Sequence, residues 1–202
     1  MNSFRLIMRT TFFIILLGFG FAYAQKGPID KARGLFVAFG VGPRLPINYF
    51  ANSSDLGYGF NVELSYTDDE YLPIFLFGKI GFDQFPGSQE LYEVSDLSNY
   101  STNALPVSFG ARYYFPPLVE NIVLFMPIVE VSFDYTYFQK LHQFKAASGK
   151  SNYLEDNSKV GFSVGTGLSM FMMEVLASYT YFQTNQYLSV DLKVRLPLYI
   201  SF

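Results

Sequence analysis

The sequence predicts an all-β fold: an eight-stranded antiparallel up-and-down transmembrane β-barrel that follows a cleaved signal peptide. Three observations lead to this prediction. Apolar and polar residues alternate with a period of two through eight segments. Only 15% of the 202 residues are charged and 19% are aromatic, whereas ordinary soluble domains carry about 25% charged residues. No segment after the N-terminal region approaches the roughly 18 consecutive apolar residues of a membrane-spanning helix.

The N-terminus has the pattern of a secretory signal peptide over residues 1–24. Arg5 and Arg9 precede an uncharged core, and the tripeptide that ends at Ala24 has the small-x-small pattern of a cleavage site. The core has about a dozen residues and a spanning helix needs about 20, so cleavage is favoured over an uncleaved anchor. The barrel domain then comprises residues 25–202. The chain has no Cys, which prevents stray disulfides in an oxidising compartment.

The C-terminal segment shows the alternation most clearly. Every second residue from Leu188 to Phe202 is apolar, and the residues between them include Asp191, Lys193 and Arg195. A strand separates these two sets onto opposite faces, whereas a helix would mix them. The same argument predicts eight strands, at residues 34–42, 56–67, 72–82, 103–115, 122–138, 159–170, 173–182 and 188–202.

The predicted connections differ in length between the two ends of the barrel. Transmembrane barrels have short periplasmic turns and longer outer loops, and three of the four connections on the side away from the termini are long. Prolines at positions 106, 127 and 197 lie inside predicted strands, where each lacks a ladder donor, so we expect bulges or shortened strands there. The long connections are residues 43–55, 83–102 and 139–158, and the short ones are residues 68–71, 116–120, 171–174 and 183–187.

The alternation by itself leaves a soluble lipocalin-type barrel as an alternative, in which the apolar face points inward. Here the polar face is mainly Gly, Ser, Ala and Thr with single charges, which suits a narrow lumen. The other face is bulky and apolar, which suits lipid. The sequence Tyr-Thr-Tyr-Phe-Gln occurs at residues 135–139 and 179–183 and predicts one aromatic girdle used twice. We expect Val131, Phe133, Val164 and Val194 to face lipid, and Glu130, Ser163 and Arg195 to face the lumen.

The predicted lumen carries eight charged side chains of balanced sign. A selective pore usually has a ring of one sign, so the balance favours ion pairs that fill the lumen over a water-lined path. We expect Glu130 to pair with Arg195 or Lys193 across the lumen. Lys79 is expected to lean toward Glu63 on the neighbouring strand. The eight ion-pair candidates are Glu63, Lys79, Arg112, Glu130, Asp134, Asp191, Lys193 and Arg195.

Other patterns give weaker signals for a site. His142, the single His, shares a loop with Ser148 and Glu155, but no spacing aligns them as a nucleophile, base and acid. The acidic run at 68–70 is interpreted as a solvated turn, because metal ligands must converge from several directions. Glycines at 161, 165 and 167 lack the helix that follows a phosphate loop.

We therefore predict no catalytic residue, cofactor or metal site and no enzymatic activity. With a net charge of −3 and no basic cluster, nucleic-acid binding is not expected.

The final strand, LKVRLPLYISF, ends in Phe202, and a terminal Phe on an alternating strand resembles the assembly signal of outer-membrane barrels. Over about residues 34–202 the chain resembles the small outer-membrane β-barrel proteins: the OmpX-like and PorT-like type, and the membrane domain of outer membrane protein A. This resemblance implies an outer-membrane location, with outer-membrane lipid and the barrel assembly machinery as partners. It implies no particular activity, because a fold does not fix a function.

The sequence leaves three functions open. The leading one is a structural or binding scaffold that presents outer loops for adhesion, envelope stability or partner docking. The alternatives are a narrow pore for small solutes and, less favoured, a membrane enzyme that modifies lipid. The balanced lumen argues against the pore, and the lone His142 argues against the enzyme. The lysines of residues 139–158 leave contact with lipid phosphates open beside ordinary solvated charge.

Overall fold

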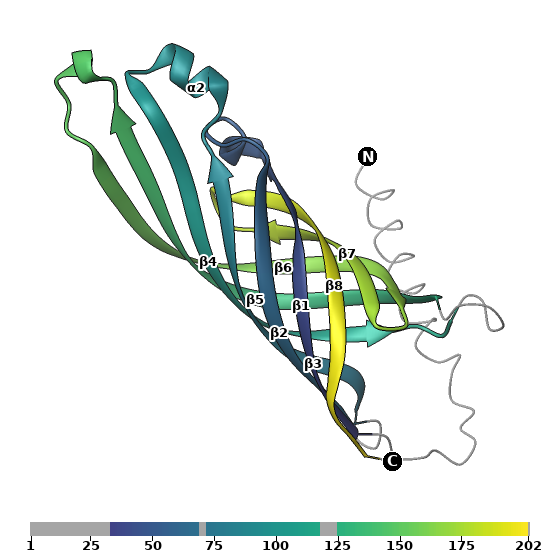
Figure 1. The fold of residues 1–202 in the computed structure, drawn as a ribbon. Helices are drawn as coiled ribbons and strands as arrows, with labels where there is room; N and C mark the ends of the chain where they lie inside the picture. Colours follow the sequence, from purple (N-terminus) through teal and green to yellow (C-terminus); the bar gives the residue numbers. More distant parts are fainter. Residues whose placement is uncertain (1–32, 69–71, 118–124, 202) are drawn as a thin grey trace, which may run out of the picture. The chain divides into compact units, whose positions relative to one another are not determined.

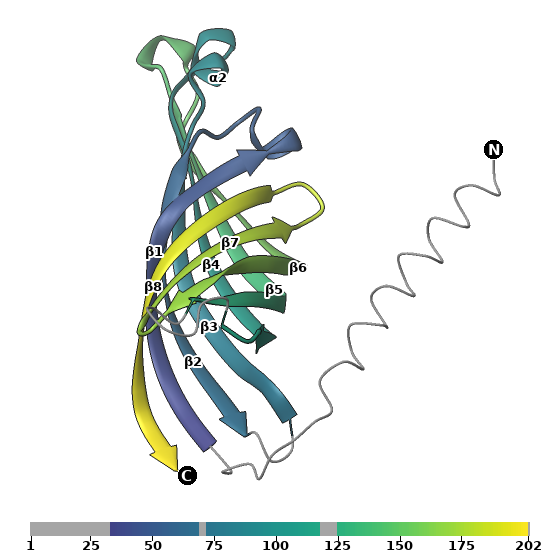
Figure 2. The same ribbon diagram turned by 90° about the vertical axis from the view of Figure 1, so that its right-hand side faces the viewer.

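The computed structural model describes residues 33–68, 72–117 and 125–201, which form a closed ring of eight antiparallel strands (Figures 1 and 2). Each strand pairs with the next in the chain, and β1 closes the ring on β8. The predicted eight-stranded up-and-down barrel is confirmed; the predicted signal peptide and Phe202 lie outside the described residues. The strands are β1 (Arg33–Ile47), β2 (Gly57–Asp68), β3 (Leu72–Pro86), β4 (Leu97–Tyr114), β5 (Phe125–Phe144), β6 (Tyr153–Met170), β7 (Met173–Tyr181) and β8 (Gln186–Ser201).

The connections define an outer and an inner end of the barrel. The outer end carries the short helix α2 (Gln89–Val94) and 3-10 turns at Asn48–Phe50 and Ala146–Ser148, and the inner end carries the two-residue turn between β6 and β7. Ser88 caps α2, because its Oγ accepts a hydrogen bond from the backbone N–H of Leu91. No helix in the described part of the chain is long and apolar enough to cross a membrane.

Three strands are much longer than the alternation predicts. β4 begins at Leu97 instead of residue 103, β5 continues to Phe144 instead of 138, and β6 begins at Tyr153 instead of 159. In Figures 1 and 2 these strands rise above the rest of the ring. Residues 97–102 of the predicted loop 83–102, and most of the predicted loop 139–158, therefore form a three-stranded sheet, which we call the outer sheet. Its strands carry polar side chains on both faces, so the alternation that marks the barrel wall is lost there.

The prolines perturb the ladder less than expected. Next to Pro197, the register between β1 and β8 shifts after Leu35, as a bulge requires. Pro106 keeps its register with β5, and the β3–β4 ladder has no residue paired with it. Pro127 pairs with Leu168 in an unshifted register. A bulge forms at one of the three prolines only.

The two faces of the wall divide as predicted. Val131, Phe133 and Val164 are 51%, 56% and 49% exposed, whereas Glu130 and Ser163 are 2% and 6% exposed. A wall that is apolar outside and charged inside fits a bilayer and not water. The barrel is therefore built to span a membrane.

The repeated Tyr-Thr-Tyr-Phe-Gln segment has two roles, and the prediction of a girdle describes one of them. Tyr135 and Tyr181 point outward and are 48% and 38% exposed, at the level of an aromatic girdle. Phe138 and Phe182 point inward and are fully buried. Their rings meet edge to face with centroids 5.4 Å apart, so the repeat also contributes to a plug in the lumen.

Candidate functional site

The inner half of the lumen is filled by an ion network centred on Arg112. The Arg112 guanidinium donates to both carboxylate oxygens of Glu63 at 2.7 Å and to Glu130 at 2.5 and 2.9 Å. Its Nη1 also lies 3.3 Å from Glu174. Because Arg112 is 1% exposed, these contacts act in a low dielectric, where a lone charge is very costly. We call this network the inner ion cluster; its members are Glu63, Lys79, Arg112, Glu130, Glu174, Lys193 and Arg195.

The pairing inside this cluster differs from the sequence expectation. Glu130 contacts Arg112 and lies 4.0 Å from the Lys79 ammonium, and it forms no ion pair within 4.0 Å with Arg195 or Lys193. The cause is the register, which places Arg112 of β4 directly beside Glu130 of β5. Lys193 and Arg195 instead contact Glu63, at 2.8 and 3.3 Å. The Lys193 ammonium is nevertheless close enough to interact electrostatically with Glu130. The expectation that Lys79 leans toward Glu63 is wrong although the two residues are register partners on β2 and β3. The Lys79 ammonium lies 4.0 Å from Glu130, and the cations that contact Glu63 are Arg112, Lys193 and Arg195.

A second network lies nearer the outer end. Arg44 donates from Nε to Asp83 at 2.8 Å and from Nη2 to Asp191 at 2.9 Å, and all three side chains are buried. Asp134 lies on the opposite wall and accepts hydrogen bonds from the hydroxyls of Ser163 and Ser132, at 2.5 and 3.2 Å. We call Arg44, Asp83, Asp134 and Asp191 the outer ion cluster.

A glycine makes room for this second network. A Cβ on Gly59 would lie 1.8 Å from Asp83 Oδ1 and 2.8 Å from Arg44 Nε. Only a residue without a side chain leaves space for the pair at this point of the wall. The glycines at 161, 165 and 167 also lie close to their neighbouring strands: a Cβ on Gly165 would meet the side chains of Ser178 and Glu130. This agrees with the interpretation of these glycines as inward-facing strand residues.

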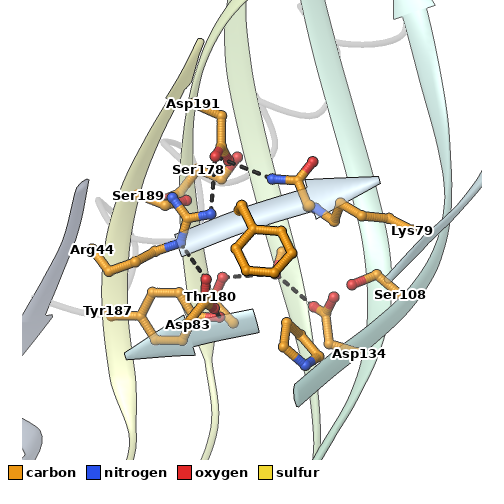
Figure 3. Close-up of a pocket in the computed structure, with 14 residues that line it drawn as sticks. Arg44, Lys79, Asp83, Ser108, Asp134, Ser178, Thr180, Tyr187, Ser189 and Asp191 are labelled. Carbon is orange, nitrogen blue, oxygen red and sulfur yellow. Dashed lines mark hydrogen bonds and ion pairs between the residues drawn. The ribbon is translucent and has the colours of Figure 1, made fainter. Parts of the chain in front are cut away.

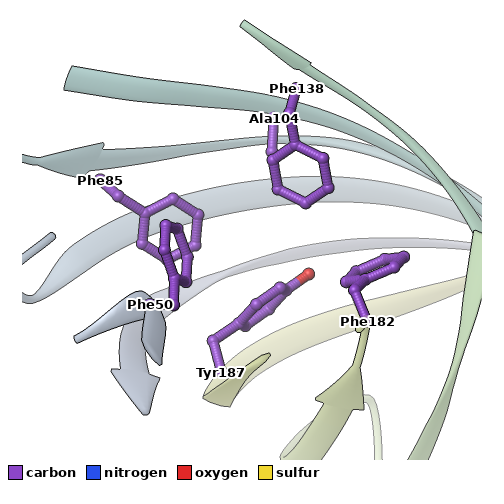
Figure 4. Packing of buried hydrophobic residues seen from close by; sticks show 6 residues of the cluster. All are labelled: Phe50, Phe85, Ala104, Phe138, Phe182 and Tyr187. Carbon is purple, nitrogen blue, oxygen red and sulfur yellow. The ribbon is translucent and has the colours of Figure 1, made fainter. Parts of the chain in front are cut away.

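Aromatic side chains close the lumen beyond both ion clusters. The outer plug comprises buried rings that pack on one another, with Phe50 and Phe85 centroids 4.8 Å apart (Figure 4). At the inner end, Arg195 lies over the rings of Phe75 and Tyr114, at 5.3 and 5.2 Å from their centroids. The residues of the outer plug are Phe50, Phe85, Ala104, Phe138, Phe182 and Tyr187.

All eight predicted ion-pair candidates lie in the lumen, and three further charged residues join them. Arg44 and Asp83 fall just outside the predicted strands, in segments assigned to connections, whereas Glu174 lies inside the predicted strand at 173–182 but is not among the predicted lumen charges. Each continues the inward phase of its strand: Glu174, for example, precedes Ser178 and Thr180 by an even number of residues. Extending the alternation by two residues would have found Arg44 and Asp83, and the alternation within residues 173–182 already places Glu174 inward. When these three residues are included, the lumen formed by the described residues holds five cationic side chains and six carboxylates. The net charge of the lumen is therefore not balanced.

In the outer sheet, the edge formed by β4 is covered. The backbone N–H of Gly87 donates to the carbonyl of Tyr100 at 2.7 Å. The Tyr92 hydroxyl of α2 accepts from the Tyr100 N–H and donates to its carbonyl, both at 3.0 Å. The backbone N–H and C=O of Tyr100 on this edge are thus satisfied by α2 and the segment before it. Covering an edge with a helix is a common way to prevent unwanted strand pairing.

Among the residues that the structure describes, no helix or strand covers the opposite edge of the outer sheet, which β6 forms. β6 pairs with β5 from Tyr153 onward, but its pairing with β7 begins only at Phe162. Residues 153–161 therefore have a strand neighbour on one side only. Alternate N–H and C=O groups of such a strand point away from the sheet. One side-chain contact reaches across: the Lys159 ammonium donates to Thr184 and Asn185 in the β7–β8 connection.

The lysines of the outer sheet are engaged in local contacts. Lys140 Nζ lies 2.7 Å from Glu155, and Lys145 Nζ donates to the carbonyls of Tyr92 and Ser95. Lys150 bonds Asp96 at 2.8 Å, and this ammonium holds the pKa of the Asp96 carboxyl below its usual range. These contacts favour the interpretation as ordinary loop charge over a lysine cluster reserved for lipid phosphates.

His142 lies in the same sheet and stacks on Tyr153, with ring centroids 4.4 Å apart. Its Nε2 is 3.3 Å from Glu155. Ser148, the serine considered as a nucleophile, donates its hydroxyl to the carbonyl of Lys145. The structure therefore uses His142 and Ser148 in separate local contacts and does not align them. The acidic turn at 68–70 is described only at Asp68, which pairs with Arg33 at 3.0 Å.

Comparison with solved structures supports the architecture. Neisserial surface protein A aligns with a TM-score of 0.52 and 14% identity, over 83% of this chain and 99% of that chain. The Yersinia pestis attachment invasion locus protein Ail has a TM-score of 0.40 at 16% identity, covering 83% and 100% of the two chains. The N-terminal barrel domain of Pseudomonas aeruginosa OprF has a TM-score of 0.43 at 11% identity, covering 82% and 100%.

No protein-family model matches the chain, and no curated protein matches it either. At these identities, the alignment with Neisserial surface protein A speaks for the fold and not for a shared activity. Together with the closed eight-stranded ring and its apolar exterior, it shows that the chain has the fold of the small eight-stranded outer-membrane β-barrels.

Proposed function

We propose that this chain is a binding protein of the outer membrane that docks an extended strand of a partner protein at the edge of β6. The observation that carries the proposal is the contrast between the two edges of the outer sheet. The β4 edge is covered by α2, whereas residues 153–161 of β6 are left without a neighbouring strand. A free edge offers unpaired N–H and C=O groups that an added strand completes.

Two other features that prevent strand pairing are absent from this edge, although it does carry the charged residues Glu155, Asp156 and Lys159. Residues 153–161 contain no proline, and their ladder with β5 has no register shift. Side chains along the edge alternate between the two faces of the sheet, with Leu154 and Val160 on one face and Glu155 and Lys159 on the other. Asp156 and Ser158 share the face of Leu154 and Val160. An added strand would thus meet apolar and polar side chains on one face and charges of both signs on the other, which gives the docking a sequence preference.

The lumen supports an anchoring role for the barrel in preference to a pore. Two ion clusters and two aromatic layers occupy it, and the rings of the outer plug are buried. We expect the refolded barrel to give no conductance steps in a planar bilayer. Steady channel openings would favour the alternative function, a narrow pore for small solutes.

The outer-membrane location is part of the same proposal. It is supported by the apolar exterior, by the fold and by the signal-peptide pattern. The role of Phe202 as the signal for the barrel assembly machinery stays a prediction. Membrane fractionation with sequencing of the mature N-terminus tests the location, and recovery as a soluble periplasmic protein would contradict it.

Panning a library of random peptides against the barrel in nanodiscs tests the docking edge. Enriched peptides should slow amide hydrogen exchange at residues 153–161 and nowhere else in β6. A variant whose β5–β6 hairpin is shortened should lose binding; Phe138 and Asn157 are register partners, so an Asn-Gly turn can join them. In the control, glycines replace Ala146–Ser148, which changes the tip and keeps the edge. Equal binding to the shortened barrel would contradict the proposal.

A further inference from the structure

The open edge of β6 has a sequence that is complementary to itself when two copies of the strand run antiparallel. If the pairing is centred on Asn157, Glu155 of each copy lies opposite Lys159 of the other. Leu154 then lies opposite Val160. Each pair occurs twice, because a two-fold axis relates the copies. Opposite charges and apolar side chains that face each other directly across two strands stabilise the pairing.

The same side chains disfavour the neighbouring registers. In the register centred on residue 157, Asp156 faces Ser158, whose hydroxyl can donate to the carboxylate. A register centred on Asp156 would set two Asp156 carboxylates opposite each other, and like charges in that position are destabilising. A register centred on Ser158 would place Asp156 opposite Val160 and Glu155 opposite Gly161, with no counter-charge for either. The pattern therefore selects a single symmetric register.

The charged groups of this register are accessible in the single chain. The Glu155 side chain is 42% exposed, although it also contacts Lys140. The Lys159 ammonium donates to the neutral side chains of Thr184 and Asn185, and no carboxylate of the described residues lies within 4.0 Å of it. Lys159 thus gains a counter-charge when Glu155 of a second copy lies opposite it.

The length of the open edge fits this register. A Cβ on Gly161 would lie 2.1 Å from the carbonyl oxygen of Tyr181, so the end of β7 reaches Gly161 and the accessible edge ends at residue 160. Residues 154–160 are symmetric about Asn157. A strand pair of this length is a small interface, so a single pair is weak and dilute barrels keep the edge open. Many such pairs between two surfaces act together.

The barrel gives this edge a braced base. Figure 3 shows Asp134 of β5 in the lumen wall, and its carboxylate accepts from the Ser163 hydroxyl of β6 at 2.5 Å, just below the open stretch. In the same view, Arg44 joins Asp83 of β3 to Asp191 of β8. A strand held in place before it binds loses less conformational freedom on docking. The ion clusters of the lumen therefore favour the pairing without taking part in it.

From these observations we infer that the strand docked at β6 is the β6 of a second copy of this chain. The inference rests on the proposed strand docking and names its partner. In Figures 1 and 2 the strands of the outer sheet rise away from the ring, so β6 has a fixed direction relative to the bilayer. A copy whose β6 runs the opposite way belongs to a barrel that is inserted the opposite way. The two barrels therefore lie in two facing membranes, and the pairing holds two cells together.

Single-cysteine cross-linking of the full barrel in nanodiscs tests the register, because the chain has no Cys of its own. Asn157→Cys puts two thiols opposite each other at the two-fold axis, so mild oxidation should yield a disulfide-linked dimer. Ser158→Cys is the matched control, since each of its thiols faces Asp156 and lies beyond disulfide distance from the other thiol. Its dimer yield should be several-fold lower. Equal yields from the two variants would overturn the register.

Charge reversal tests the contact between membranes. Phosphatidylcholine vesicles that carry the barrel should aggregate, and the turbidity of the suspension measures this. Glu155→Lys or Lys159→Glu alone sets like charges opposite each other, so vesicles of either variant should stay dispersed. A mixture of the two should aggregate again, because each variant then meets the opposite charge at both positions. A mixture that stays dispersed would contradict the inference.

The peptides selected against the edge separate this inference from the proposed function. If those peptides bind residues 153–161 while the native barrel neither cross-links through Asn157→Cys nor aggregates vesicles, the partner is another protein. Strand docking then stands and the self-pairing is wrong. If neither the peptides nor a second copy bind, both proposals are wrong. Dimers whose formation an excess of the selected peptides prevents would support both.

Discussion

The barrel wall and the outer sheet share strands, yet they differ in the pattern of their side chains and in the number of strand neighbours. β6 has a buried polar face and a lipid-facing apolar face between Phe162 and Met170, and two strand neighbours. Above that stretch it has polar side chains on both faces and one neighbour. In lipid every backbone group must be paired within the protein, whereas water satisfies an open edge. The surroundings of a strand, and not its length, decide whether its edge can stay open.

The largest expected difference between the two regions concerns ion pairs. Arg112→Met leaves Glu63 and Glu130 buried without their main partner and should cost about 3–5 kcal/mol of unfolding free energy. Lys150→Met breaks an exposed pair of the outer sheet and should cause no measurable loss. Urea titration of folding into bilayers measures both. Similar costs would mean that the lumen is as well solvated as the outer sheet.

The second difference concerns the outward face of one strand. Val164→Arg places a charge in the lipid-facing wall and should cost about 2–4 kcal/mol near the midplane. Leu154→Arg lies on the same face of β6 but above the wall and is already 57% exposed, so it should be tolerated. The same titration compares them. A high cost at Leu154 would place the outer sheet inside the bilayer and would abolish the distinction.

The third difference is steric and concerns two glycines of neighbouring strands. Gly59→Ala forces a methyl group onto Asp83 and Arg44 and should cost about 1–3 kcal/mol through overpacking. Gly78→Ala meets only the ring of Phe109, at an ordinary contact distance of 3.5 Å, and should be close to neutral. If both variants unfold at the native urea concentration, the Arg44–Asp83 pair is not as confined as described.

The smallest expected effect is a pH dependence in the outer sheet. Lys150 lowers the pKa of Asp96 in the folded state, so the stabilising contact is present above the ordinary carboxyl pKa and is lost as the pH falls through the lowered value. The Asp96 carboxyl resonance followed by NMR should titrate below the range of an unpaired Asp. Lys150→Met should return it to that range, and an unchanged titration would show that the pair does not form.

Predictions from the sequence were correct for the barrel wall and failed for the outer sheet. Alternation predicted the strand count, the facing of Val131 and Glu130, and the lumen position of all eight ion-pair candidates, because one environment lies on each side of the wall. It failed above the wall, where β4, β5 and β6 continue without alternation. The pairing of Arg112 with Glu130 also escaped prediction, because it depends on a cross-strand register that a single sequence does not specify.

The contribution of single residues at strand ends was the hardest to foresee. Arg44 and Asp83 lie two and one positions beyond a predicted strand end, and Glu174 is the second residue of the predicted strand at 173–182. Strand ends are where alternation has the fewest residues to support it. These three residues change a balanced lumen into an unbalanced one. The charge imbalance of the lumen was therefore not evident until the structure placed these three residues inside.

Residue-resolved amide hydrogen exchange of the barrel in nanodiscs tests most directly whether β6 joins a closed wall to an open edge. The structure predicts slow exchange at every amide from Phe162 to Met170, which has strands on both sides. Between residues 153 and 161, alternate amides point away from β5 and should exchange quickly. Uniformly slow exchange along the whole of β6 would contradict the account, because the edge proposed for docking would then already be covered.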